Sequence, residues 1–304
     1  MKLQNFFLTC AVVLVGADWG WAGVDVPTKF SNVGSIANTR HNMTQRQRPL
    51  DGGPVINIAL MDVYRNDYQE VCVYCHTPHG ANTSAALPLW NRTMLTGTVY
   101  STYDQLKTSS LTQVVDARPG AASLSCLSCH DGQTAVDSII NMPGSGRYQA
   151  SQATSQDNNF LSTWNNNASG ATTAAHIGLK DLECLGCHSP SAPGIFASAT
   201  DFTLFAIGTD LKNDHPVGIT YPVTSGTSTE FKTTDGQRGT TFFFDDGDSQ
   251  MEKDEVRVYD GKVECASCHD PHGVPSAGAG STFKPTFLRV ANIGSALCLT
   301  CHTK

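Results

Sequence analysis

Hydrophobic positions along the chain form short, irregular groups rather than long periodic runs. Alternating or β-branched stretches at residues 219–223, 240–244 and 256–259 predict β-strands, and Asp260-Gly261 has the composition of a hairpin turn. Residues 101–115 predict a helix. Between these stretches the chain is rich in Gly, Ser, Thr and Asn, which favour turns and loops. We therefore expect a mostly irregular, coil-rich fold with short helices and a small β-hairpin region.

The N-terminus has the pattern of a secretory signal peptide. Lys2 precedes an apolar run over residues 6–16, and a small-x-small site ends at Ala22. The run is too short to span a bilayer comfortably, and no later apolar stretch approaches that length. We expect residues 1–22 to be removed and the remainder to be secreted, periplasmic or extracellular, with no membrane span.

One short motif occurs five times in the sequence: two cysteines three positions apart, with a histidine directly after the second. The copies are, in chain order, Cys72, Cys75 and His76; Cys126, Cys129 and His130; Cys184, Cys187 and His188; Cys265, Cys268 and His269; and Cys298, Cys301 and His302. This C-x-x-C-H pattern is the attachment signature of a c-type haem, in which each thiol bonds the porphyrin and the histidine binds the iron.

The cysteine count supports haem over the alternatives. The five copies use ten of the 11 cysteines and five of the 10 histidines. Zinc knuckles and disulfide frameworks do not require a histidine after every second cysteine. The remaining cysteine, Cys10, lies inside the signal peptide. The sequence therefore predicts five covalently attached haems c.

Composition favours a fold that depends on these groups. Aromatic residues make up only 8% of the chain, so a conventional core would be poor. Haems are large and apolar and can supply the missing core. We expect residues 23–304 to form a single pentahaem cytochrome c domain organised around a haem chain. The motifs start at irregular intervals, which argues against one repeated module per haem.

Five histidines lie outside the motifs, equal in number to the expected irons. They are His41, His79, His176, His215 and His272. The equality predicts that every iron has two histidine ligands. Two alternatives stay open: some of these histidines are ordinary surface residues, or a methionine binds one iron and raises its potential. The available methionines are Met43, Met61, Met94, Met142 and Met251.

Spacing restricts which haem two of these histidines can serve. His79 and His272 each follow a motif histidine by three residues. A side chain that starts from the same short segment as His76 or His269 cannot reach the opposite face of the same haem. His79 and His272 are therefore expected to bind neighbouring haems, which places haems close together.

His41 lies in an N-terminal arm, residues 23–60, before the first motif. The sequence leaves two destinations open for its ring. It can fold back onto a haem of its own chain, or it can reach a haem of the next subunit, which would bring haems of two subunits together.

Charge limits the choice of partners. The formal net charge is -7, so nucleic acid is not expected to bind. An acidic run over residues 245–255 lacks the spacing of a known calcium loop, and a solvated turn is the better interpretation.

The segments CVYCHTPHG (72–80), CASCHDPHG (265–273) and HPVG (215–218) resemble motifs of the multihaem c-type cytochromes with doubled C-x-x-C-H sections. The likeness covers the haem-bearing framework from about Asn38 to His302. In that family the haems form a chain that passes electrons. Some secreted members have an N-terminal histidine arm and polymerise into extracellular filaments used by metal-reducing bacteria. The resemblance thus implies electron transfer to redox proteins or extracellular acceptors, with self-association into filaments as a further expectation.

These observations predict an electron-transfer protein rather than an enzyme, because an iron with two protein ligands has no open site for a substrate. The alternative is a multihaem reductase of a small oxyanion such as nitrite. It would need one haem without a distal histidine, and the C-x-x-C-K site of the familiar pentahaem nitrite reductases does not occur in this chain. A third interpretation is a structural fibre subunit.

Overall fold

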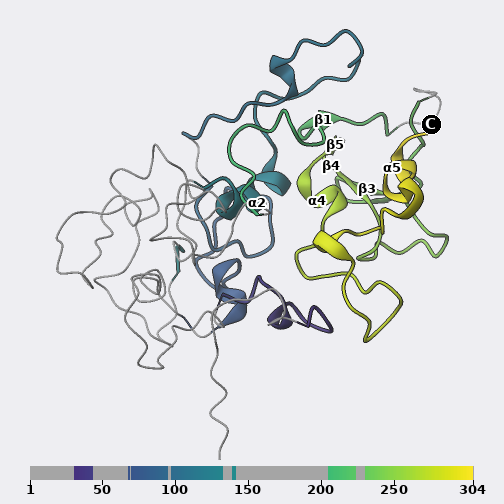
Figure 1. The fold of residues 1–304 in the computed structure, drawn as a ribbon. Helices are drawn as coiled ribbons and strands as arrows, with labels where there is room; N and C mark the ends of the chain where they lie inside the picture. Colours follow the sequence, from purple (N-terminus) through teal and green to yellow (C-terminus); the bar gives the residue numbers. More distant parts are fainter. Residues whose placement is uncertain are drawn as a thin grey trace, which may run out of the picture.

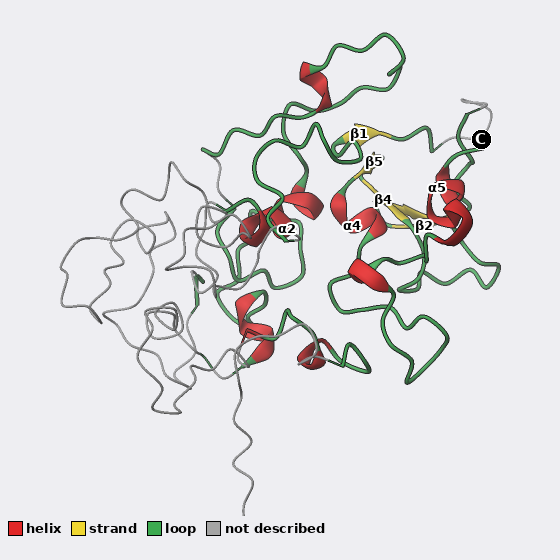
Figure 2. Cartoon of the chain, in the orientation of Figure 1, coloured by secondary structure: helices red, strands yellow, loops and turns green. Residues whose placement is uncertain are grey.

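The computed structural model describes residues 31–43, 68, 70–94, 97–132, 139–141, 205–223 and 230–303. Figure 1 shows how these segments are arranged, and Figure 2 shows that loops and turns connect short helices and strands. The helices, of which η marks the 3-10 type, are η1 (Ile36–Asn38), η4 (Val71–Tyr74), η5 (Tyr103–Gln105), α2 (Ala121–His130), α4 (Cys265–Cys268), η11 (Pro285–Phe287), η12 (Ile293–Ser295) and α5 (Ala296–Cys301). The strands are β1 (Ile219–Thr220), β2 (Gly236–Arg238), β3 (Thr241–Phe243), β4 (Arg257–Tyr259) and β5 (Lys262–Val263).

The strands form one antiparallel sheet in the order β1-β5-β4-β3-β2. The stretches expected to be strands overlap β1, β3 and β4. The turn between β4 and β5 is Asp260-Gly261, with φ of 51° and 76°. Positive φ at both turn residues matches the twist of the strands they join, which is why Asp-Gly is favoured there. The sheet leads directly into α4, which carries the fourth motif.

The helix predicted over residues 101–115 is wrong. Only η5 is helical in that range, and the two ends of the range pair with distant segments: Ser101 bridges Asp210, and Val115 bridges Ile219. Serine and threonine side chains after η5 weaken the helical preference, since they compete with a helical backbone, and the distant pairings then decide the conformation. The helix instead begins at Ala121, after Pro119 and Gly120 end the preceding segment, and it carries the second motif.

Among the residues that the structure describes, apolar side chains gather in small separate clusters rather than in one large core. One cluster contains Tyr68, Val73, Tyr74 and Ile139, and Met43 of the N-terminal arm packs against it. A second joins Leu127 of α2 to Leu211 and Val217. A third lies on the sheet and includes Ile219, Tyr221, Val258 and Val263. Within the described residues no helix has the length and apolar character needed to cross a membrane.

Part of the N-terminal arm packs on the C-terminal half of the chain. Val33 bridges Thr282, and the backbone N–H of Phe283 donates to the carbonyl of Asn32 at 2.7 Å. Thr39 and Asn42 of the same segment are buried. Residues 31–43 are therefore fixed in place by segments that lie more than 200 positions away.

Candidate functional site

Four of the five motifs lie in described residues, and each sits on a short helical segment. They are carried by η4, α2, α4 and α5. All eight cysteines of these motifs are free rather than paired in disulfides.

The third motif lies outside the described residues. Its expected haem-binding residues are Cys184, Cys187 and His188. The expected distal ligand His176 and the expected signal peptide, residues 1–22, also lie outside the described residues. The roles predicted for Cys184, Cys187, His188 and His176 therefore stay predictions from the sequence.

The backbone around three motif histidines follows one repeated arrangement, which we call the histidine clasp. His76 bridges Trp90, His269 bridges Leu288 and His302 bridges Phe231. In each case the residue after the histidine donates its N–H to the residue before the partner, and the residue after the partner donates to the second cysteine of the motif. The clasp thus fixes the histidine backbone against a second segment.

The rings of three motif histidines are oriented through Nδ1. His76 Nδ1 lies 2.8 Å from the carbonyl of Pro88, and His269 Nδ1 lies 2.7 Å from that of Thr286. His130 Nδ1 lies 2.6 Å from the carbonyl of Phe205. Because a carbonyl only accepts, Nδ1 carries the proton and Nε2 keeps its lone pair for a metal. This is the arrangement that metal-binding histidines ordinarily have.

Two clasps also share an unusual backbone feature. The residue before the clasp partner, Leu89 in the first motif and Phe287 in the fourth, has φ of 52° and 59°. Thr286, whose carbonyl holds His269, has φ of 52° as well. Bulky and β-branched residues rarely adopt this conformation, and its presence marks a position that the surrounding structure imposes.

Three histidines outside the motifs have the same ring orientation. His272 Nδ1 lies 2.9 Å from Oδ1 of Asp270. His41 Nδ1 lies 3.3 Å from the carbonyl of Pro271, and His215 Nδ1 lies 3.0 Å from that of Pro216. In each of these rings Nδ1 therefore carries the proton and Nε2 keeps its lone pair. His79 is exposed, and its backbone carbonyl accepts hydrogen bonds from Thr77 and Asn141.

The structure places two of these rings near motif histidines. The centroids of His76 and His272 lie 6.2 Å apart with planes at 13°, and those of His41 and His130 lie 6.3 Å apart with planes at 85°. Burial lowers the pKa of His215, the hydrogen bond to the Pro216 carbonyl opposes this, and the neighbouring His302 ring adds a smaller lowering.

The thiols of neighbouring motifs lie within reach of one another's charge. Burial raises the pKa of Cys75 to about 12, and Cys129 of the second motif adds to the rise. Burial likewise raises the pKa of Cys265 to about 12, with a contribution from Cys126. The pKa of Cys301 is raised to about 12 by burial and then by Cys268. Cysteines of the first and second, the second and fourth, and the fourth and fifth motifs thus lie close enough for their charges to interact.

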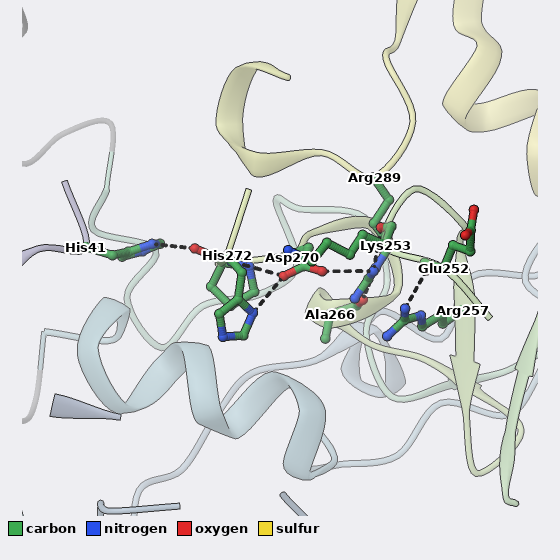
Figure 3. A network of polar contacts seen from close by, with 9 residues as sticks. His41, Glu252, Lys253, Arg257, Ala266, Asp270, His272 and Arg289 are labelled. Carbon is green, nitrogen blue, oxygen red and sulfur yellow. Dashed lines mark hydrogen bonds and ion pairs between the residues drawn. The ribbon is translucent and has the colours of Figure 1, made fainter. Parts of the chain in front are cut away.

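A buried polar network fixes the segment after the fourth motif (Figure 3). Asp270 Oδ1 accepts from the backbone N–H and from Nδ1 of His272, while Oδ2 pairs with Arg289 Nη1 at 3.3 Å. Arg289 also donates to the carbonyls of Ala266 at 3.0 Å and Lys253 at 2.7 Å. Burial alone would raise the pKa of Asp270, but the His272 hydrogen bonds and the Arg289 charge lower it from 3.8 to about 2. Sequence reasoning missed Asp270 and Arg289. The signal available for Asp270 was an acidic residue between His269 and His272.

A second polar link joins two motif helices. The carboxylate of Glu264, just before α4, accepts hydrogen bonds from Ser123 Oγ of α2 and from the backbone N–H of Gly120 at 3.0 Å. The backbone N–H of Cys265 donates back to Ser123 Oγ at 2.8 Å. Burial raises the pKa of Glu264, and these hydrogen bonds oppose that rise. The second and fourth motifs are thereby held side by side, as Figure 1 shows for α2 and α4.

In the acidic run, ligand oxygens of Asp245, Asp246 and Asp248 lie within 4.8 Å of one another. These carboxylates have partners in the turn itself: Asp245 accepts from the N–H of Ser249 at 3.0 Å, and Asp248 accepts from the N–H of Gln250 at 2.7 Å. These hydrogen bonds explain why the carboxylates lie close together in a turn, and they give no support to a calcium site.

The residues present fit a c-type haem. Paired free thiols lie one helical turn apart, and each oriented motif ring leaves Nε2 available. Trp90 packs edge-on to His76, with ring centres 5.9 Å apart. Its Nε1 is buried and has no hydrogen-bond partner among the described residues, as expected of a donor to a haem propionate. When bound, such a group supplies reversible one-electron chemistry at its iron.

A family model described as the doubled CXXCH motif matches residues 258–304, which contain the fourth and fifth motifs. No curated protein matches the chain. Residues 258–304 are therefore similar to the doubled C-x-x-C-H sections of c-type cytochromes, and this region is a c-type haem-binding region.

Proposed function

We propose that this protein is a pentahaem c-type cytochrome that relays electrons in the periplasm or outside the cell, and that it is not an enzyme. The proposal extends the haem binding indicated for residues 258–304 to all five motifs, including the third with Cys184, Cys187 and His188. Its covalent and proximal ligands are the fifteen motif residues, and its distal ligands are His41, His79, His176, His215 and His272.

The observation that carries the proposal is the common ring orientation. Six histidines, three in motifs and three outside them, direct Nδ1 to a carbonyl or carboxylate within 3.3 Å. Ordinary surface histidines have no reason to share this arrangement, whereas ligands on both faces of an iron do. An iron held by two imidazoles has no position for a substrate and exchanges only electrons.

Adjoining motifs support a relay rather than isolated centres. Thiols of the first, second, fourth and fifth motifs lie near enough to influence one another's pKa. Groups attached at these positions would lie close together, as electron transfer between them requires. The proposed partners are redox proteins or extracellular electron acceptors. Binding to nucleic acid and a membrane span are not part of the proposal.

Two measurements on the native secreted protein test this proposal. Intact mass should exceed that of the processed chain by five haems, and the magnetic and optical spectra of the oxidised protein should contain only low-spin iron at neutral pH. A high-spin haem would instead favour the multihaem reductase with one open iron. Fewer than five haems would contradict the stoichiometry from which the proposal starts.

Localisation and self-association are tested separately. Fractionation should place the protein outside the cytoplasm, processed near Ala22. Size-exclusion chromatography and negative-stain microscopy of the secreted material should show whether it forms filaments. A monomer would leave the electron-transfer proposal intact and would contradict the expectation of a filament subunit.

A further inference from the structure

We propose that the segment Asp270-Pro271-His272, which follows the fourth motif, completes the distal side of two other haems. His272 binds the iron held by His76, and the Pro271 carbonyl orients His41 to bind the iron held by His130 within the same chain. This inference rests on the proposed haem binding and specifies its wiring.

The ring spacings are those of two imidazoles on one metal. A metal–nitrogen bond of about 2.0 Å plus about 1.1 Å from Nε2 to the ring centre puts the two centroids about 6.2 Å apart. The His76–His272 and His41–His130 distances are 6.2 and 6.3 Å. Two nearly parallel rings stacked in van der Waals contact would have closer centroids than the rings of His76 and His272 have. In all four rings Nδ1 contacts a protein oxygen that accepts its proton, so Nε2 carries the lone pair that a metal would use.

The position of His272 is set by its buried neighbours. Asp270 is held by Arg289, and its Oδ1 accepts from both the backbone and the ring of His272 (Figure 3). The Asp270 and Arg289 side chains are only 8% and 3% exposed, so this anchor is shielded from water. His269, three residues earlier, is oriented separately by Thr286. The two histidines thus have independent anchors, as expected if they serve different irons.

The position of His41 is set by the same segment. Its Nδ1 lies 3.3 Å from the carbonyl of Pro271, the contact drawn from His41 in Figure 3. Its ring centre lies 4.6 Å from that of Phe287. The arm that carries it is tied down by the Val33–Thr282 bridge and by the burial of Thr39. These contacts favour a ligand supplied within one chain over a ligand exchanged between subunits.

Together the two pairings bring three haems to one place. The segment begins one residue after His269, which belongs to the fourth motif, and reaches the first and second motifs through His272 and His41. The two irons would also differ in a measurable way, because one has nearly parallel imidazole planes and the other has nearly perpendicular planes. In oxidised bis-imidazole haems, parallel planes give a rhombic low-spin paramagnetic resonance spectrum and perpendicular planes give a strongly anisotropic one.

The test compares the spectra of the intact pentahaem protein and of three variants. His272→Gly should keep five haems, lose one rhombic component and gain one high-spin haem, and added imidazole should restore the low-spin state. His41→Gly should instead lose a strongly anisotropic component. Ser276→Ala, an exposed position on the loop that follows, should leave the spectrum unchanged.

A further variant keeps the test decisive if the glycine variants fail to fold. His272→Met should replace one bis-histidine haem by a histidine–methionine haem, with its characteristic charge-transfer band in the red. The pairing is overturned if His272→Gly leaves every haem low-spin, or if either glycine variant loses the opposite spectral class. A wild-type protein with a high-spin haem or fewer than five haems would instead contradict the proposed function, so the two failures are distinguishable.

Discussion

Arg289 and Asp270 form a buried ion pair, with Nη1 of the arginine 3.3 Å from Oδ2 of the carboxylate. Asp270 directly follows His269, and Arg289 directly follows Leu288, the clasp partner of His269. The ion pair therefore closes the loop between positions 270 and 289. Arg289 directs further donors to two backbone carbonyls. A charged residue is thus at the centre of the region that holds His272, the proposed distal ligand.

Replacing Arg289 by alanine should destabilise the folded protein strongly. The change leaves the Asp270 carboxylate buried without its cation and leaves two partly buried carbonyls without donors, a loss of about 3–5 kcal/mol in the free energy of unfolding. Denaturant unfolding of the haem-loaded protein measures it. Arg238→Ala is the matched control, because Arg238 is exposed on β2 and should change stability by less than about 0.5 kcal/mol. Equal effects of the two variants would contradict a structural role for the pair.

Replacing Asp270 by asparagine should raise the potential of one haem. A carboxylate that accepts Nδ1–H makes the imidazole a stronger electron donor and so stabilises the oxidised metal. An amide accepts more weakly, and a rise on the order of 50 mV, roughly tenfold in the one-electron equilibrium, is expected. Spectroelectrochemical titration resolves it. Glu252→Gln, which removes an exposed negative charge from the same region, should leave the potentials nearly unchanged. A uniform shift of all haems would point to overall charge instead.

Asp270 should also contribute a pH-dependent part of the stability. Its pKa is about 2 in the folded protein and 3.8 without the fold, because burial, which favours the neutral form, is outweighed by the His272 hydrogen bonds and the Arg289 charge. The stabilisation is therefore fully present above the unfolded value and is lost as the pH falls from about 4 towards 2. It amounts to about 2 kcal/mol. The stability difference between wild type and Asp270→Asn should shrink over this range, and a constant difference would show that the carboxylate does not titrate as described.

The Ser123–Glu264 hydrogen bond should couple the helices of the second and fourth motifs. A double-mutant cycle of Ser123→Ala and Glu264→Gln should give a coupling energy of about 1–3 kcal/mol, because the bond is buried and its acceptor is a carboxyl group. The free energy of unfolding of all four proteins measures it. Additive effects would mean that α2 and α4 are held by packing alone. Because burial raises the pKa of Glu264, stability due to its protonated form falls as the pH rises above the unfolded value.

Local sequence signals predicted some parts of the fold and failed at others. The Asp260-Gly261 turn and strands β3 and β4 were predictable, because alternation and turn chemistry are local. The helix expected over residues 101–115 failed because Ser101 and Val115 pair with segments about a hundred positions away. Tertiary pairing there decided against a weak local preference.

The candidate site shows the same division. The motifs and the histidines outside them are visible in the sequence, because haem attachment requires fixed residue types at fixed spacing. The clasp partners Trp90, Leu288 and Phe231 were not predictable, since a backbone bridge demands no particular side chain. The approach of His41 to His130 depends on the docking of the arm, for which spacing gives no information. The expected haem count, the third motif and the filament role stay predictions.

Gly273 allows a final test of how His272 is positioned. Its φ is +82°, and an added Cβ would overlap the ring of Phe283, which is buried beside it. Gly273→Ala should therefore cost about 1–2 kcal/mol for the left-handed backbone and about 1–3 kcal/mol more for the overlap. Gly278→Ala is the matched control: its φ is +90°, but nothing lies within 4 Å of an added Cβ, so only the backbone cost is expected. Because Gly273 directly follows His272, the first variant should also perturb one rhombic low-spin component, whereas the control should not. Equal stability losses in the two variants would show that Phe283 yields freely and that this contact does not fix the segment.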